Sequence, residues 1–531
     1  MRNRAADIPT PTLVPETEKS AERAKFQREM GHISRQSSVF FAGTIFTAAT
    51  AYLFKVYLAR KLGAEALGIY TLGMTIIGFL GIFNALGLPQ SALRFVAAYR
   101  ATGQLDLLRG LLVRGTLLLL FANLTLGGLV LVVGPWVAVH FYHTPELNPY
   151  LLLFALIMLT GAMNTWLGQV LGGYRDVARR TLITNFIGSP LMMLFTIALV
   201  TAGYALRGYI WAQVASAVIV TVLLAVAVWR LTPREARGFS APPARLERQV
   251  ISFSAAAFGI SFLEFLMAQA DKVMVGFYLN AREVGIYAVA AALVTFVPIV
   301  LQSVNQIFAS TIADLHARHD HQLLGRLFQT LTKWILGMTL PLAISIMIFA
   351  APLMRIFGPD FEAGWPILVI GTAGQLVNCA VGSVGYMLMM SGNQHRLIRV
   401  QAFAAGLMVV LNIVLIPKWG LAGAAIAAAA TVAVSNLWYL AEVKRALHLM
   451  PYNRSQVRLI VPLIVCIAAV FAVRMFFRNQ PAWLSAGCGL ALGYAVFIAV
   501  ALLAGLDDDD RMIARAVWKR VRGYLPGEAY I

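Results

Sequence analysis

The sequence predicts an all-α, polytopic membrane protein of about fourteen transmembrane helices, built as two pseudo-symmetric six-helix lobes plus two extra C-terminal helices. The composition is one observation behind this prediction, because 59% of the 531 residues are hydrophobic and only 13% are charged. A soluble domain carries about 25% charged residues. Apolar runs of transmembrane length also recur along the chain, and passages of the first half return in the second.

Apolar runs long enough to cross a bilayer occupy most of the chain between two polar ends. A transmembrane helix needs about 20 mainly apolar residues, so each run predicts one crossing. The spans are expected near 37–59, 68–89, 109–133, 149–173, 181–202, 208–229, 250–270, 285–310, 329–351, 366–390, 398–417, 420–440, 458–477 and 484–506.

An internal repeat relates the two halves. Residues 54–70, FKVYLARKLGAEALGIY, and residues 271–287, DKVMVGFYLNAREVGIY, align without a gap and share Lys, Val, Leu, Ala and a closing Gly-Ile-Tyr. Other passages repeat at nearly the same offset. Each half holds an even number of spans, so both run the same way through the membrane, about an axis along its normal. We interpret the shared Gly-Ile-Tyr as scaffold, with the glycine for a tight outer turn or for close helix approach and the tyrosine for the membrane interface.

The repeat and the composition set the predicted boundaries. We do not expect a signal peptide before the first span, because the N-terminal segment is polar and rich in proline. The predicted units are a disordered tail at 1–36, the first lobe at 37–230, a linker at 231–249, the second lobe at 250–440, a loop at 441–457, two further helices at 458–506 and a tail at 507–531.

The formal charge of +19 orients the protein and does not indicate a nucleic-acid partner. With a cytoplasmic N-terminus, the inner segments hold 30 Lys and Arg residues and the outer loops hold 8. This bias is the positive-inside pattern, and basic inner loops also meet anionic lipid headgroups. Both termini are therefore expected on the cytoplasmic side of a multi-pass membrane protein.

Enzyme motifs are missing from the sequence. There is no phosphate-binding glycine loop, nucleophile elbow or zinc-protease motif, and the predicted outer loops are too short to hold a catalytic domain. Cys379, Cys466 and Cys488 all lie in apolar runs without metal-ligand spacing. We therefore expect a transporter without cofactor or bound metal, driven by an ion gradient or by downstream consumption of its cargo.

Several separated passages resemble one protein family. ARKLGAEALGIYTLGMTIIGFL, GLPQSALRFVAAY, ADKVMVGFYLNAREVGIYAVAAAL and LNIVLIPKWGLAGAAIAAAAT are similar to the signatures of bacterial polysaccharide-export flippases. These belong to the multidrug/oligosaccharidyl-lipid/polysaccharide exporter superfamily. The resemblance covers about residues 35–445 and implies alternating access. It also implies a cargo of undecaprenyl-pyrophosphate-linked oligosaccharide, flipped across the bacterial inner membrane for O-antigen, capsule or exopolysaccharide assembly, with a polysaccharide polymerase as an expected partner.

Two repeat-related lysines are candidates for holding that cargo. Lys55 lies on the first helix, and Lys272 takes the equivalent place on the seventh. Because charges inside a bilayer are costly, buried ones are candidates for function. One interpretation has both ammonium groups facing a central cavity and clamping a pyrophosphate. In the other, each lysine extends to the outer interface. Both interpretations stay open here.

Two carboxylates near Lys272 are candidates for ion coupling. Glu264 and Asp271 are seven positions apart, so they share a helix face. Either one is suited to taking up H⁺ or Na⁺ and coupling that gradient to the movement of the lobes. The alternative is a structural ion pair with a lysine.

Polar residues elsewhere complete the candidate cargo site. Gln302, Asn305 and Gln306 form an amide stripe on the eighth span, suited to sugar hydroxyls or to hydrogen bonds between helices. Arg94 matches the family's motif arginine and suits either the pyrophosphate or anionic headgroups.

Three other functions compete with this interpretation. A peptidoglycan-precursor flippase also carries a pyrophosphate lipid. A multidrug-type exporter shares the predicted fold, although paired lysines disfavour cationic drugs. A non-transporting scaffold of a polysaccharide-synthesis complex is the third, and buried charges in both lobes disfavour it.

Overall fold

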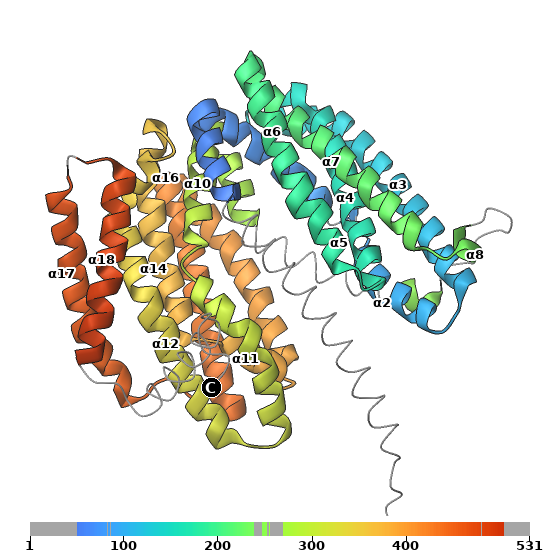
Figure 1. Cartoon of the computed structure of the whole chain (residues 1–531). Helices are drawn as coiled ribbons and strands as arrows, with labels where there is room; N and C mark the ends of the chain where they lie inside the picture. The colour runs from blue at the N-terminus through green and yellow to red at the C-terminus, as the bar shows by residue number, and fades with distance from the viewer. Residues whose placement is uncertain are drawn as a thin grey trace, which may run out of the picture.

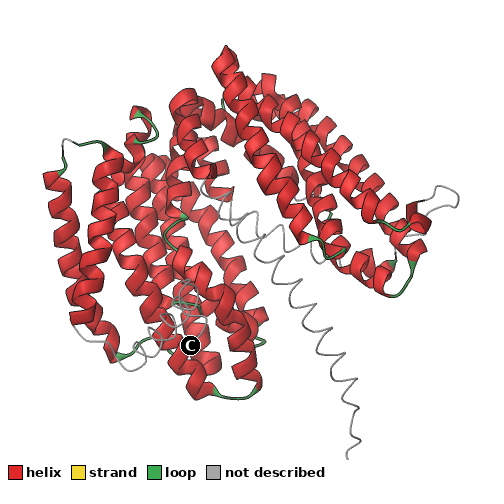
Figure 2. Ribbon diagram, in the orientation of Figure 1, coloured by secondary structure: helices red, strands yellow, loops and turns green. Residues whose placement is uncertain are grey.

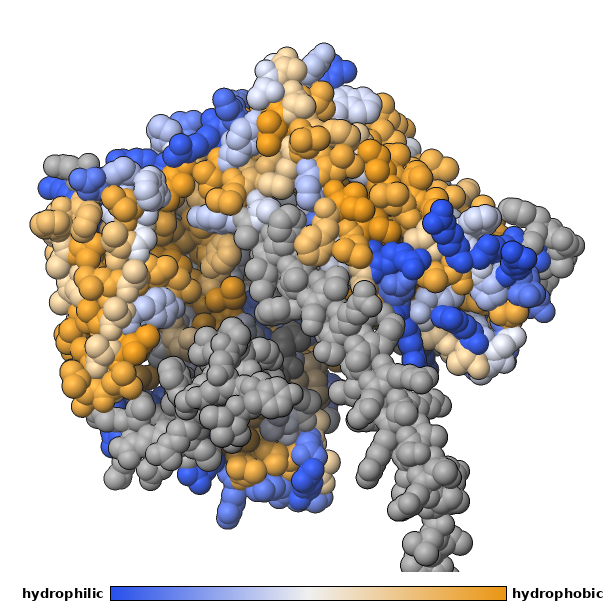
Figure 3. Space-filling model, viewed as in Figure 1, coloured by the Kyte–Doolittle hydropathy of each residue, from blue (hydrophilic) through white to orange (hydrophobic). Residues whose placement is uncertain are grey.

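The protein consists of helices joined by short turns. The computed structural model describes residues 50–81, 83–84, 86–237, 247–251, 254, 269–478 and 480–503. Every regular element within these ranges is helical (Figure 2). Apolar atoms cover the middle of the molecule, and hydrophilic residues gather toward its ends (Figure 3). This surface is the one expected of an all-α membrane protein, so the predicted fold class is confirmed.

The helices of the first half form one bundle, here called the N lobe (Figure 1). Its long helices pack side by side, with α4 against α3 and α7, and α6 against α7. The elements are helix Thr50–Gly81, α2 Leu88–Ala101, α3 Leu105–Trp136, α4 Leu151–Gly173, α5 Val177–Thr181, α6 Ser189–Leu199, α7 Ala205–Leu231 and α8 Arg234–Arg237.

The second half forms the C lobe, against which the last two helices pack (Figure 1). α16 packs on α14, and α17 and α18 pair with each other and contact α12. The elements are the helical segment 269–278, α10 Ala281–Val294, α11 Ile299–Ala317, α12 His321–Ile348, α13 Ala350–Arg355, α14 Trp365–Val381, α15 Val384–Met390, α16 Gln394–Leu447, α17 Ile460–Phe476 and α18 Ala482–Leu503.

Nine helices in the described ranges are long and apolar enough to cross a membrane, or ten if α10 and the first residues of α11, bent by 51°, count as one span. Three of the nine contain residues of two predicted spans each. They break at Gly63, Gly203 and Gly420, whose φ angles of 80°, 93° and 53° are in the left-handed region that favours glycine. The count of fourteen and the exact domain boundaries stay predictions.

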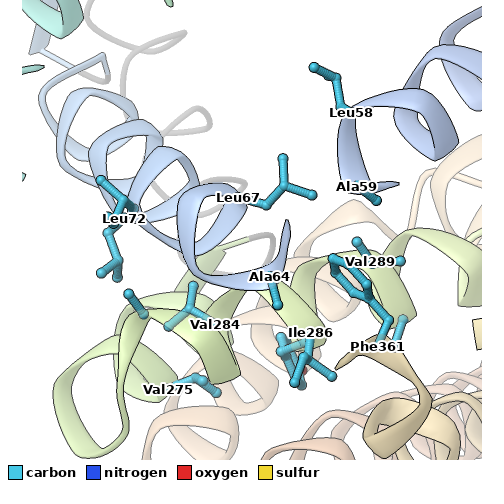
Figure 4. Packing of buried hydrophobic residues seen from close by; sticks show 14 of the residues in the cluster. Leu58, Ala59, Ala64, Leu67, Leu72, Val275, Val284, Ile286, Val289 and Phe361 are labelled. Carbon is cyan, nitrogen blue, oxygen red and sulfur yellow. The ribbon is translucent and has the colours of Figure 1, made fainter. Parts of the chain in front are cut away.

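The two lobes meet at one end of the molecule and separate toward the other (Figure 1). At the meeting end, here called the apex, one hydrophobic core contains residues of both lobes, among them Leu67, Leu72, Val275 and Val284 (Figure 4). At the other end the N lobe has its own core, which includes Trp166. Around Phe328 the C lobe has another. The open end carries the loops after α2, α4, α7 and α11. Their location on the cytoplasmic side stays a prediction from the charge bias.

The apex is held by two glycines that the repeat relates to each other. A Cβ atom on Gly68 would lie 1.6 Å from the carbonyl oxygen of Ala281, and one on Gly285 would lie 1.9 Å from the carbonyl oxygen of Ala64. The two glycines are 217 residues apart, and so are the two alanines that they contact. The crossing is therefore a small-xxx-small contact repeated about the pseudo-twofold axis, which allows the backbones to touch. The predicted role of these glycines in close helix approach is confirmed.

Candidate functional site

The two repeat-related lysines lie within electrostatic range of each other at the apex. Lys55 and Lys272 are both half-buried, and their charges are close enough to interact. The Nζ atom of Lys272 donates a hydrogen bond of 2.9 Å to Oε1 of Gln269. Two like charges in a partly buried place repel each other, so this arrangement favours an anion between them.

The carboxylate of Asp271 lies beside Lys272, and residues of the second copy of the repeat hold it by hydrogen bonds. The hydroxyl of Tyr287 donates a 2.9 Å hydrogen bond to Oδ2 of Asp271, and the backbone N–H of Lys272 donates a 2.8 Å bond to Oδ1. α10 positions Tyr287 because Asn280 and Glu283 form a capping box at its first turn. Tyr287 is the closing tyrosine of the second Gly-Ile-Tyr. It is only 2% exposed, so its interpretation as an interface residue is wrong.

A cavity of about 390 Å³ lies next to Lys55, at the junction of the lobes. Its N-lobe wall includes Tyr70 and Tyr209, whose ring centroids are 4.9 Å apart, while Gly285 and Ala288 of α10 contribute from the C lobe. The amide of Gln213 donates a 2.9 Å hydrogen bond to the hydroxyl of Tyr70. We call this space the apex cavity. It combines a cation with aromatic faces, which suits a phosphorylated sugar.

Sequence reasoning missed the apex-cavity tyrosines as site residues. Tyr70 is the tyrosine of the first Gly-Ile-Tyr, which the repeat indicates as scaffold. Tyr209 carries no motif at all. Only the packing of α7 against helix Thr50–Gly81 brings its ring to Tyr70.

The remaining predicted residues lie apart from this cluster or outside the described residues. Arg94 is exposed on α2, toward the open end, with its guanidinium 5.4 Å from the ring centroid of Phe95. On α11, Gln302 is exposed and Asn305 is 9% exposed, with its side-chain oxygen lacking a hydrogen-bond partner among the described residues. Glu264 and the side chain of Gln306 lie outside the described residues.

Relatives of known name share most of the chain's length. A probable low-salt glycan biosynthesis flippase, Agl15, of Haloferax volcanii is 21% identical over 410 residues, covering 76% of this chain and 82% of the relative. A probable flippase of the same organism, AglR, is 21% identical over 436 residues, covering 80% and 86%.

Solved structures share the fold. Lipid II flippase MurJ in an inward closed conformation matches with a TM-score of 0.68 and 14% identity, over 88% of this chain and 97% of that one. An inward-facing multidrug resistance transporter of the MATE family matches with a TM-score of 0.61 and 15% identity, over 75% and 94%.

Fold and relatives together define the class, a flippase-type membrane transporter of the multidrug/oligosaccharidyl-lipid/polysaccharide exporter superfamily. The chain belongs to the polysaccharide biosynthesis protein family, whose model matches residues 33–311.

Proposed function

We propose that this protein flips an undecaprenyl-pyrophosphate-linked oligosaccharide across the bacterial inner membrane, for surface polysaccharide assembly. The observation that carries the proposal is that Lys55 and Lys272, one cation from each lobe at repeat-related positions, lie close enough to interact electrostatically. A pyrophosphate is a multivalent anion that accepts hydrogen bonds from two ammonium groups at once. The family supports a glycan cargo, and the names of two relatives agree with flipping.

The geometry suggests how alternating access would proceed. The lobes are open toward the basic loops, which we assign to the cytoplasm, so cargo enters there and its pyrophosphate reaches the lysines at the apex. The glycine crossing closes the outer side in this state. Binding across both lobes favours a state in which the crossing separates and the cavity opens outward, since a ligand shifts a conformational equilibrium only through contacts that differ between the states.

A peptidoglycan precursor is the second candidate cargo. It presents the same pyrophosphate to the lysines, and a lipid II flippase shares the fold. A multidrug exporter fits less well, because Lys55 lines the apex cavity and Lys272 adds to the positive charge near it, which repels cationic drugs. A scaffold without transport gives no reason for these lysines to meet.

Deletion of the gene tests the choice of cargo. We expect a lipid-linked oligosaccharide to accumulate on the cytoplasmic side of the inner membrane, together with loss of surface polysaccharide, because the polymerase acts on flipped units. The measurement is mass spectrometry of extracted undecaprenyl lipids. Accumulation of a peptidoglycan precursor would favour the second cargo. Intact polysaccharide without any accumulated intermediate would contradict flipping.

Asp271 is the described candidate for coupling to an H⁺ or Na⁺ gradient. It accepts a hydrogen bond from Tyr287, and this contact ties the carboxylate to the helix that carries Gly285. We expect Asp271→Asn to abolish the dependence of flipping on an imposed gradient while retaining slow downhill flipping in vesicles, because an amide binds neither ion as a carboxylate does. Glu264→Gln is the companion variant. Unchanged gradient dependence in both variants would exclude these residues from coupling.

A further inference from the structure

A second and larger cavity lies at the junction of the lobes, beside the apex. Its volume is about 500 Å³. Its N-lobe wall includes helix Thr50–Gly81 and the C-terminal end of α3. Its C-lobe wall includes Ala270, Val273 and Met274 of segment 269–278. We call it the lateral pocket. Because both lobes line it, any occupant contacts both halves of the transporter.

The lateral pocket is suited to hydrocarbon. Two hydroxyls line it, and each is already bonded within the protein. Thr75 donates to the carbonyl oxygen of Leu72 over 2.7 Å, so the hydroxyl of Tyr142, 3.0 Å away, is the donor in the bond between them. The other lining side chains are apolar. A polar ligand would lose its hydration there without gaining hydrogen bonds, whereas each buried methylene group contributes favourably.

The pocket is open to the membrane side. Phe79, Leu129 and Val133 line it and yet remain 48%, 45% and 41% exposed. These residues lie in helices that are long and apolar enough to cross a membrane, so lipid tails are the expected neighbours of their exposed surface. An apolar chain therefore passes between pocket and bilayer without crossing a polar barrier.

The lateral pocket and Lys272 lie on opposite sides of the helical segment 269–278. Ala270, Val273 and Met274 share the face that lines the pocket, while Lys272 is rotated by about 200° from Ala270. An amphiphile with an anionic end and an apolar chain fits across this turn, its charge at the lysines and its chain in the pocket.

The equivalent place on the other side of the pseudo-twofold axis is filled by protein. Phe79 corresponds to Phe296 at the 217-residue offset. The ring of Phe296 packs edge-on against Tyr52, with centroids 5.6 Å apart, and Tyr52 packs in the same way against Phe357 at 6.0 Å. At this place three rings pack together across the two lobes, whereas Phe79 lines an open pocket, so the two sides differ.

We propose that the lateral pocket binds the isoprenoid segment next to the pyrophosphate of the carried lipid, and that the lipid chain enters the bilayer on this side only. The inference rests on the proposed function. It adds a second determinant of cargo recognition, selective for the chain and independent of the sugar.

Two adjacent valines of α3 provide a matched test. Val133 lines the pocket, whereas Val132 is 79% exposed and lies outside the lining. We expect Val133→Phe to weaken binding of undecaprenyl pyrophosphate to the purified full-length protein by about tenfold, because the ring occupies the space of the chain. Binding of inorganic pyrophosphate should stay unchanged, since it needs the lysines alone. Val132→Phe should change neither affinity.

A photoreactive p-benzoylphenylalanine in place of Val133 gives an independent readout in the membrane. We expect it to crosslink the undecaprenyl chain, and the same group in place of Val132 to crosslink phospholipid. If Val133→Phe binds undecaprenyl pyrophosphate as the wild type does and the crosslinked product is phospholipid only, the lateral pocket is an ordinary lipid site and the inference is wrong, although the proposed function stands. If the wild type binds neither pyrophosphate compound, both fail.

Discussion

Gly68→Val and Gly285→Val should each abolish transport by preventing closure of the apex. A valine at either position forces side-chain carbons into the carbonyl group of the opposite lobe, because even a Cβ would lie within 2 Å of Ala281 or Ala64. Overpacking of this kind costs about 1–3 kcal/mol, and more where backbone must move. A cost of about 3 kcal/mol shifts a two-state equilibrium by roughly 150-fold. Both variants should therefore populate a state whose apex is open.

The distance between spin labels across the apex measures this shift. Cysteines in place of Lys61 and Arg282 put one label on each lobe, at exposed positions. We expect a short, narrow distance distribution in the parent protein and a longer one in both valine variants. Gly406→Val is the control, because this helical glycine has open space where its Cβ would lie. Wild-type transport and an unchanged distance in both apex variants would refute the role of the crossing.

Removing Lys55 and Lys272 should have the second-largest effect. A hydrogen bond to a charged group contributes about 1.5–3 kcal/mol, so Lys55→Gln and Lys272→Gln should each weaken pyrophosphate binding by roughly 10- to 100-fold. The effect of the double variant should be smaller than the product of the two single effects, because both cations hold one anion. Equilibrium binding of undecaprenyl pyrophosphate is the measurement.

Thermal stability separates cargo binding from a structural role. Lys55 and Lys272 repel each other without cargo, so Lys55→Gln relieves that repulsion and should leave the melting temperature unchanged or raised. Lys272→Gln also removes the hydrogen bond to Gln269 and the attraction to Asp271, so Lys55→Gln is the variant that makes this test. Lys61→Gln, at an exposed position of the same helix, is the matched control for lost charge. If the double variant bound undecaprenyl pyrophosphate as the wild type does, the alternative would hold in which both lysines extend to the membrane interface.

The sequence predicts much of this fold because the two copies of the repeat are short continuous passages that align without a gap. The all-α membrane class follows from apolar runs, whose length is fixed by the bilayer. The shared Gly-Ile-Tyr also predicts close helix approach, which Gly68 and Gly285 confirm. One helix–turn–helix passage, present once in each lobe, therefore supplies most of the apex.

The site is less predictable, because it depends on which helices meet across the lobes. Tyr287 resembles an interface residue in sequence, and only the packing of α10 against segment 269–278 brings its hydroxyl to Asp271. The lateral pocket could not be predicted, because a repeat predicts only what its two copies share. Phe79 lines this pocket, whereas the equivalent Phe296 packs against Tyr52. Residues on one helix face can be grouped by periodicity, whereas partners far apart in sequence cannot.

Reconstitution tests the central claim most directly. The purified protein is placed in vesicles that contain a fluorescent undecaprenyl-pyrophosphate-linked oligosaccharide, and a reagent that cannot cross the membrane reports how much of this lipid is exposed outside. We predict that the protein exposes the whole labelled pool within minutes, and that the Lys55/Lys272 double variant exposes only the half initially outside. Equal exposure in protein-free vesicles and in vesicles with the wild-type protein would contradict the assignment as a flippase of lipid-linked oligosaccharide.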